Sequence, residues 1–298
     1  MQDEMNMEYL SEIQDHKMRL KDLAQMIYDL CGLNYLDNLP LLASKVSKRL
    51  SGLNMTFGEY IECLTRNPQE WDHLVELITN NETYFFREES QLNELSHVIL
   101  PQFRDKKCIR IWSAACSTGE EPYSLAMTIA ESGIVPLKSV HIIATDINRK
   151  VLQIARRGWY PKNSLCFRRT PKEMLDRYFI PQDDGFQIKG FIKDRIEFRY
   201  ANLLNDQDLA PVEKVDILFC RNVLIYFDSE ATRRVIAKFD RLLNPGGYLF
   251  LGHAETLTGM NTNFETIHAH STFYYRKRSN DSGVHHLDET LSQGGKAN

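Results

Sequence analysis

Apolar residues in the first part of the chain recur at the spacing of amphipathic helices. Between about residues 8 and 80 they fall three or four positions apart, so each set lies along one side of a helix. Three such stripes run through Leu20, Leu23, Ile27 and Leu30, through Leu42, Val46 and Leu50, and through Trp71, Leu74 and Ile78. The pattern predicts a small all-helical N-terminal domain over residues 1–80.

From about residue 108 short apolar runs alternate with helical segments. This alternation is typical of β-α units on a parallel sheet, so we expect an α/β domain over residues 81–278. Turn glycines between the short alternating stretches of 185–200 predict a small antiparallel ribbon followed by another strand of the sheet, so a small β-subdomain is expected at about 180–200. Strands are expected at 108–114, 140–146, 215–222, 248–253 and 271–278.

Local signals predict where helices of this domain begin and where the chain turns. A capping box at Ser117–Glu120 should open a helix that ends at Gly133, and Asp228 should cap a later helix. The run Asn244–Gly247 should form a turn between a helix and a strand. Residues 279–298 are polar and glycine-rich, and we expect this tail to be disordered.

Composition and charge exclude several classes of protein. The sequence shows neither an apolar run of about 18 residues nor a signal peptide, so we expect a cytoplasmic protein without direct membrane insertion. The formal charge of −4 argues against a nucleic-acid partner. The six cysteines form no C-x-x-C pair and no histidines stand at ligand spacing near them, so no metal site is expected. Lys45, Lys48 and Arg49 either face an acidic partner or form an ordinary solvated helix face.

Polar residues directly after predicted strands are the first candidates for a ligand site, because open α/β sheets bind ligands at the carboxyl ends of their strands. Asp146 could accept hydrogen bonds from ribose hydroxyls, or it could cap the next helix. The loop after the first strand lacks G-x-G-x-x-G, which disfavours a nicotinamide dehydrogenase. A glutamate at the start of a helix is stabilised by the helix dipole, which is enough to explain the presence of at least one of Glu120 and Glu121. A cationic ligand would explain the other.

Several motifs occur in order along the chain: NETYFFRE from residue 81, WSAACSTGEEPYS, ATDIN, ANLL, FCRNVLIYF and LNPGGYLFLGHAE. Together they resemble the CheR chemotaxis protein-glutamate methyltransferases, over essentially residues 20 to 277. The resemblance implies a helical receptor-recognition domain and a Rossmann-like methyltransferase domain with a small β-subdomain insertion. By composition alone, Phe85 and Phe86 in the first motif indicate packing residues.

The resemblance also implies a cofactor and its site. S-adenosylmethionine, which leaves as S-adenosylhomocysteine, would be surrounded by Asn81, Thr83, Arg87, Glu121, Asp146, Asn202, Leu203, Arg221 and Asn222. Tyr226 would lie near the transferable methyl group, and Arg87 would hold the acceptor. The catalytic roles of Arg87 and Tyr226 rest on the resemblance alone.

The implied reaction is methyl transfer to glutamate side chains on the cytoplasmic methylation helices of chemoreceptors, for sensory adaptation. An ionised carboxylate is already a nucleophile, so no general base is required. The motifs leave open a related enzyme of another sensor pathway, or a receptor-binding module without catalysis. Family members that dock a receptor C-terminal pentapeptide have a longer insertion than Asp183–Arg195 here. We therefore expect no obligatory pentapeptide tether.

Overall fold

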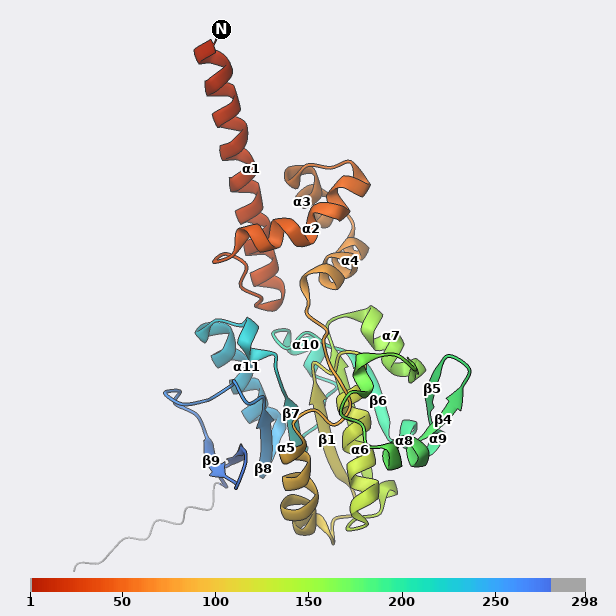
Figure 1. Ribbon diagram of the computed structural model, residues 1–298. Coiled ribbons are helices and arrows are strands. Elements are labelled where there is room, and N and C mark those ends of the chain that lie inside the picture. Colours follow the sequence, from red (N-terminus) through yellow and green to blue (C-terminus); the bar gives the residue numbers. More distant parts are fainter. Residues whose placement is uncertain (1, 280–298) are drawn as a thin grey trace, which may run out of the picture.

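The computed structural model describes the backbone of residues 2–279, with side-chain surroundings from residue 14 onward. The chain begins with a helical domain, which lies above an α/β domain in Figure 1. The predicted tail, 279–298, falls outside the described residues except for its first residue. None of the described helices is long and apolar enough to cross a membrane. The helices of the first domain are α1 (Gln2–Cys31), α2 (Leu39–Leu53), α3 (Phe57–Arg66) and α4 (Pro68–Ile78).

Short capping segments define the helices of the N-terminal domain. The side chain of Asn38 accepts from the N–H of Leu41 at the start of α2, and Thr56 with Glu59 forms a capping box at the start of α3. The predicted apolar stripes meet in one core, in which Leu23, Ile27 and Leu42 are fully buried. The prediction of an all-helical domain is therefore confirmed.

A seven-stranded sheet forms the centre of the described α/β domain, in the order β6-β2-β1-β7-β8-β10-β9. The first five strands of this order are parallel, while β10 and β9 run antiparallel at one edge. This is the predicted Rossmann-like sheet. Its strands are β1 (Ile109–Ala114), β2 (Val140–Asp146), β6 (Ile196–Tyr200), β7 (Val215–Cys220), β8 (Leu243–Leu251), β9 (Phe264–His268) and β10 (Phe273–Lys277).

Helices cover both faces of the sheet, so each buried strand contributes alternate residues to two cores. Ile111 and Ile217 face α6, whereas Trp112 and Leu218 face α11. A helical segment that no sequence signal predicted precedes β1 and packs on the α6 side. These helices are α5 (Glu89–Glu94), η1 (Leu95–Ile99), η2 (Leu100–Phe103), α6 (Glu120–Ser132), η3 (Leu137–Ser139), α7 (Arg149–Arg157), α10 (Asp206–Leu209), η5 (Leu224–Tyr226) and α11 (Ser229–Leu242).

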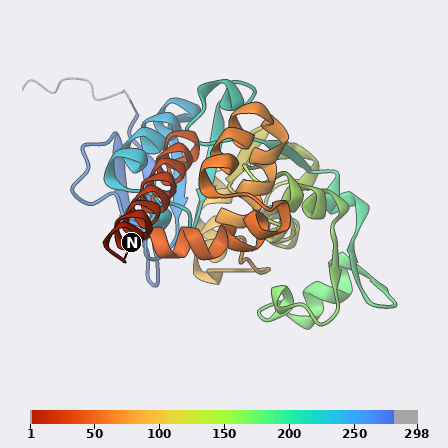
Figure 2. The same cartoon turned by 90° about the horizontal axis from the view of Figure 1, so that it is seen from above.

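A second, three-stranded antiparallel sheet leaves the main domain after α7. Its strand order is β3-β5-β4, and Figure 2 shows it to one side of the molecule. The sequence placed this β-subdomain at about 180–200, but its strands begin at Trp159. The further sheet strand expected after the ribbon is β6, which pairs with β2 in the main sheet. Its elements are β3 (Trp159–Pro161), η4 (Leu165–Phe167), α8 (Lys172–Tyr178), β4 (Phe179–Gln182), β5 (Gly185–Ile188) and α9 (Gly190–Lys193).

One of three local predictions in the main domain was wrong. The capping box at Ser117–Glu120 does not form, because the Ser117 hydroxyl donates to the carbonyl of Asn81 and Gly119 occupies the N-cap. The expected turn at 244–247 is present as an interruption near the start of β8: the partner of β7 passes from Leu243 to Tyr248 while β7 advances only from Val215 to Ile217, and Gly246 has a φ of 73°. Asp228 also caps α11 as predicted, accepting from the N–H of Ala231.

Candidate active site

A cavity of about 620 Å³ lies between the two domains, above the carboxyl ends of β1, β2 and β7. Its floor comes from the loops after these strands, and its roof from the α1–α2 loop and from Lys45 of α2. The chain folds over it through residues 79–87, which join the two domains. Every residue that the sequence proposed for the site lines this cavity: Asn81, Thr83, Arg87, Glu121, Asp146, Asn202, Leu203, Arg221, Asn222 and Tyr226.

Asp146 ends β2 and is buried at the cavity floor. Its two oxygens accept from the N–H groups of Ser117 and Asn148, both at 2.8 Å. Burial raises the pKa of this carboxyl to about 6, although the two N–H groups act in the opposite direction. The side chain of Asn148, rather than that of Asp146, caps α7. Asp146 therefore lies where a ligand could reach it, and its carboxylate oxygens have further lone pairs that can accept hydrogen bonds from ligand hydroxyls.

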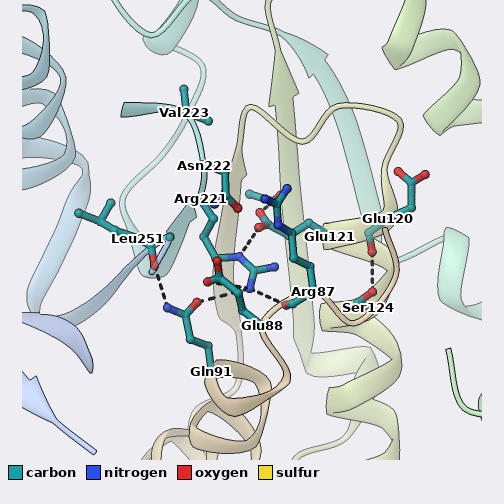
Figure 3. Close-up of polar contacts among 12 residues, drawn as sticks. Arg87, Glu88, Gln91, Glu120, Glu121, Ser124, Arg221, Asn222, Val223 and Leu251 are labelled. Carbon is teal, nitrogen blue, oxygen red and sulfur yellow. Dashed lines mark hydrogen bonds and ion pairs between the residues drawn. The ribbon is translucent and has the colours of Figure 1, made fainter. Parts of the chain in front are cut away.

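Arg221 lies at the centre of a buried charge cluster below the cavity (Figure 3). Its Nε donates to Glu121 Oε2 at 2.7 Å, and its Nη1 donates to the carbonyl of Arg87 at 2.7 Å and lies 3.6 Å from Glu88 Oε2. Glu121 also accepts from the Ser113 hydroxyl at 2.6 Å. With its side chain only 3% exposed, Arg221 holds the cavity wall together, and its charge is already balanced.

The two glutamates at the start of α6 have different surroundings. Glu121 joins the Arg221 cluster, whereas the side chain of Glu120 points away from it (Figure 3). Glu120 accepts from the Thr118 hydroxyl at 2.6 Å. Burial raises the pKa of its carboxyl to about 7. Glu121 therefore belongs to the cavity and Glu120 to the domain interior, a division that the sequence left open.

Arg87 projects toward the cavity from a segment with unusual backbone geometry. Its neighbours Phe86 and Glu88 both have positive φ, at 59° and 58°. The N–H of Phe86 donates to the Ser124 hydroxyl, and Arg221 holds the carbonyl of Arg87. Among the described residues, the Arg87 guanidinium donates only to the carbonyl of Glu82, at 3.3 Å. Arg87 thus remains available to a carboxylate ligand.

Phe85 and Phe86 are buried in the core, as composition predicted, and neither lines the cavity. Apolar walls come instead from Leu33, Ile147, Leu203 and Val223. The proposed site residue Leu203 is thus a wall residue. Of the polar residues in the same motif, Asn81 donates to the Thr79 hydroxyl at 3.1 Å.

Glu255 organises the loop after β7, a role that sequence reasoning missed. Its carboxylate accepts from the N–H groups of Asn222, Val223 and Leu224 at 2.7–2.9 Å, and from Gly252 at 2.6 Å. The loop carries Asn222 in the left-handed region and ends at Tyr226. Glu255 is part of the GHAE motif, but its role depends on a loop about 30 residues earlier.

Two of the site residues join the domains. Asn202 donates from Nδ2 to the carbonyl of Leu30 at 2.5 Å, and its Oδ1 accepts from the N–H of Leu204. The hydroxyl of Tyr226 accepts from Asn80 Nδ2 at 2.8 Å. Sequence reasoning also missed Tyr35, whose buried ring lines the cavity and whose hydroxyl donates to the carbonyl of Ile78 at 2.5 Å.

Comparison with known proteins agrees with the motifs. Residues 81–273 match the CheR methyltransferase, SAM binding domain, and residues 18–79 match the CheR methyltransferase, all-alpha domain. The chain belongs to the CheR methyltransferase family. A chemotaxis protein methyltransferase of Borreliella burgdorferi is 38% identical over 84% of this chain and 92% of that protein. A second, Cher2 of Pseudomonas putida, is 34% identical over 83% of this chain and 94% of that protein.

The cavity of this CheR family member fits S-adenosylmethionine. Its volume of about 620 Å³ lies within the range of small-molecule sites. Asn222 Oδ1 is buried without a hydrogen-bond partner among the residues that the structure describes, so it can accept from a ligand. Asp146 would hold ribose hydroxyls, and its carboxylate favours a cation over a phosphate, whereas the charge of Glu121 is already paired with Arg221. Among the described residues, no group of three or more His, Cys, Asp or Glu could hold a metal ion.

Proposed function

We propose that this enzyme methylates glutamate side chains in bacterial chemoreceptors, as an S-adenosylmethionine-dependent protein-glutamate O-methyltransferase. The single observation that carries the proposal is the Arg87 guanidinium, which lines the cofactor cavity without a carboxylate partner among the described residues. Relatives covering more than four-fifths of the chain are named chemotaxis protein methyltransferases. An acceptor glutamate would complete the charge balance of the site.

The residues of the cavity suit a carboxylate acceptor. A glutamate with an ordinary pKa near 4.3 is ionised at neutral pH, so the site needs no general base. Arg87 can bind such a carboxylate through charge-assisted hydrogen bonds and align one oxygen for attack. Alignment of this kind contributes roughly 7–11 kcal/mol in favourable cases. S-adenosylmethionine supplies the methyl group on a good leaving group.

The cavity walls also favour the reaction. Carboxylate and sulfonium charges are neutralised as the methyl group moves, so an apolar, closed site favours the less charged transition state. Leu33 and Leu203 supply apolar surface from the two domains, and Tyr226 lies at the mouth with 38% of its surface exposed. Methylation then removes a charge from the receptor helix, and this change alters its electrostatics and packing.

We further propose that the N-terminal domain recognises the cytoplasmic methylation helices of the receptor, in the cytoplasm, and that no pentapeptide tether is obligatory. Transfer of labelled methyl groups to receptor cytoplasmic fragments, followed by peptide mapping, tests the function. We expect label in base-labile esters of specific glutamates. Binding of S-adenosylhomocysteine without transfer to any receptor fragment would overturn the assigned substrate but not the assigned cofactor.

A further inference from the structure

The segment Tyr226–Asp228 belongs to the catalytic domain, but the N-terminal domain and the linker also bind it directly. The N–H of Asn34 donates to the carbonyl of Tyr226 at 3.4 Å, and Leu33 forms an antiparallel bridge with Phe227. The side chain of Asn80, between the domains, donates to the Tyr226 hydroxyl at 2.8 Å. Contacts from two separate parts of the chain therefore converge on two adjacent residues, Tyr226 and Phe227.

Tyr28 of α1 adds a side-chain contact to this set. Its hydroxyl donates to Asp228 Oδ2 at 2.8 Å, across 200 residues of sequence. The other oxygen, Asp228 Oδ1, accepts from the N–H of Ala231 and caps α11. One carboxylate thus connects α1 to the start of α11, and a hydrogen bond to an ionised acceptor is stronger than one between neutral groups.

The catalytic domain fixes the preceding part of this loop by itself. Glu255 binds the N–H groups of Asn222 to Leu224 at 2.7–2.9 Å, but its contact with Ile225 is already long, at 3.4 Å. Beyond Ile225 the loop continues as a single turn. In this turn the N–H of Tyr226 donates to the carbonyl of Val223, and the N–H of Phe227 donates to the carbonyl of Leu224. At its far end the loop is anchored where Asp228 accepts from the N–H groups of Ala231 and Thr232 in α11. Outside the catalytic domain, the Tyr226 ring is held by the contacts of its own hydroxyl and of the second Asp228 oxygen.

We propose that Tyr28 is a positioning residue for methyl transfer, which acts through Asp228 to hold Tyr226 at the cavity. The inference rests on the proposed function of this site. It gives the helical domain a second role beside receptor recognition, because α1 completes the geometry of the catalytic loop. A receptor that moves α1 on docking would then change the position of Tyr226.

The test compares Tyr28→Phe with wild type in the full-length protein. Loss of one hydrogen bond should lower kcat for receptor methylation about three- to tenfold. The KM for the receptor fragment and the calorimetric Kd for S-adenosylhomocysteine should stay within about twofold. Asp228→Ser, which keeps a helix cap but cannot reach Tyr28, should reproduce the kinetic effect. The matched control is Tyr60→Phe, which removes another tyrosine hydroxyl bonded to a carboxylate in the same domain and should leave kcat unchanged.

A double-mutant cycle separates positioning from general destabilisation. If Tyr28 acts through the Tyr226 ring, Tyr28→Phe should have little further effect on kcat in a Tyr226→Ala background, which lacks the ring. Additive effects, or an equal loss of kcat in Tyr60→Phe, would overturn the proposal. Hydrogen exchange needs no substrate: the amides of Tyr226 and Phe227 should exchange faster in Tyr28→Phe. Unchanged exchange at these amides would also overturn the positioning role of Tyr28. Faster exchange in a protein that methylates no receptor would support the contact between Tyr28 and this loop and would contradict only the proposed function.

Discussion

Asp146 combines burial with two N–H contacts, and its affinity for ligand hydroxyls should depend on its charge. Because Asp146 has a pKa of about 6, it is ionised at pH 8 and partly protonated below pH 6. Hydroxyl donors favour the ionised form, so affinity for S-adenosylhomocysteine should fall as the pH drops through 6. Asp146→Ala should weaken binding by about 1–3 kcal/mol at pH 8 and remove this pH dependence.

Calorimetry at pH 5.5 and 8 measures both effects for Asp146. The matched control is Asp183→Ala, which removes an exposed carboxylate from the turn between β4 and β5. Its affinity should equal that of wild type at both pH values. Full affinity in folded Asp146→Ala would exclude this residue from the cofactor site.

Arg87 and Tyr226 should differ from Asp146 in affecting transfer more than cofactor binding. Arg87→Ala removes the proposed charge-assisted contact with the acceptor, at about 1.5–3 kcal/mol, which is roughly a ten- to hundredfold loss of rate. Tyr226→Phe keeps the ring and should slow transfer less. Single-turnover transfer at saturating cofactor is the measurement. Wild-type rates in folded Arg87→Ala would contradict its role, and loss of cofactor binding would reassign Arg87 to the cofactor.

Sequence motifs predicted which residues gather at the cavity, but not what each contacts. Arg221 and Glu121 are 100 residues apart, and their pairing appears only once β7 lies beside β1. Likewise the partner of Asn202 is the carbonyl of Leu30, 172 residues away. Motifs identify residues near the strand ends, whereas hydrogen-bond partners depend on how the domains pack.

At the scale of elements, α2 presents fewer free cations than its sequence indicates. Arg49 forms a two-pronged pair with Glu70, at 2.9 and 2.6 Å, and Glu70 also accepts from Tyr60. The pairing lowers the pKa of Glu70 and fixes Arg49 within the domain. Lys45 donates to the carbonyl of Leu77 at the cavity, so Lys48 is the exposed cation of the three.

A charge-reversal experiment on α2 follows from this difference. Lys48→Glu should raise the KM for receptor fragments, more at low salt than at high salt, and leave cofactor affinity unchanged. Arg49→Glu should instead destabilise the N-terminal domain, because it leaves Glu70 buried beside a like charge. Steady-state methylation at two ionic strengths, with thermal unfolding of both variants, distinguishes the two roles. A salt-independent KM in Lys48→Glu would make Lys48 an ordinary solvated residue.

The small antiparallel sheet is longer than its sequence pattern indicated, since only β4 and β5 form a hairpin while β3 comes from a distant segment. Its pairing joins Trp159–Pro161 to Gly185–Gln187, a contact that local turn signals cannot predict. The short strand β9 and the short helix α5 escaped prediction for a similar reason, because their burial comes from neighbours far along the chain. Regular apolar periodicity, in contrast, predicted the helical domain and the central strands.

The prediction that no pentapeptide tether is needed started from a compact insertion at Asp183–Arg195. The larger sheet weakens that premise, but the prediction can still be tested. Both outer strands, β3 and β4, have a free edge within the small sheet, and strand addition is the expected mode for a bound tail peptide. We still expect methylation of a receptor fragment to be equally fast with and without its C-terminal pentapeptide. Calorimetry with the free pentapeptide should show no micromolar binding, and such binding would refute the prediction.

At the scale of the whole molecule, Glu120 should make stability depend on pH in an unusual direction. Burial raises the pKa of its carboxyl from 4.5 to about 7, so the folded protein favours the protonated form. Between these pH values the unfolded chain binds fewer protons than the folded protein, and stability falls as pH rises. Each pKa unit corresponds to about 1.4 kcal/mol, which gives an upper limit of about 3 kcal/mol for this group.

Glu120→Gln isolates this contribution, because glutamine keeps an acceptor for the Thr118 hydroxyl and does not titrate. Its free energy of unfolding relative to wild type should increase between pH 4.5 and 7 by up to about 3 kcal/mol, and should then stay constant. Urea unfolding at pH 4.5, 6 and 8 measures the difference, in which other titrating carboxylates cancel. Glu173→Gln, an exposed substitution in the first turn of α8, is the control and should follow wild type. A constant difference between Glu120→Gln and wild type would mean that Glu120 has the same pKa in the folded protein as in the unfolded chain, which requires a cation or water beside its carboxylate.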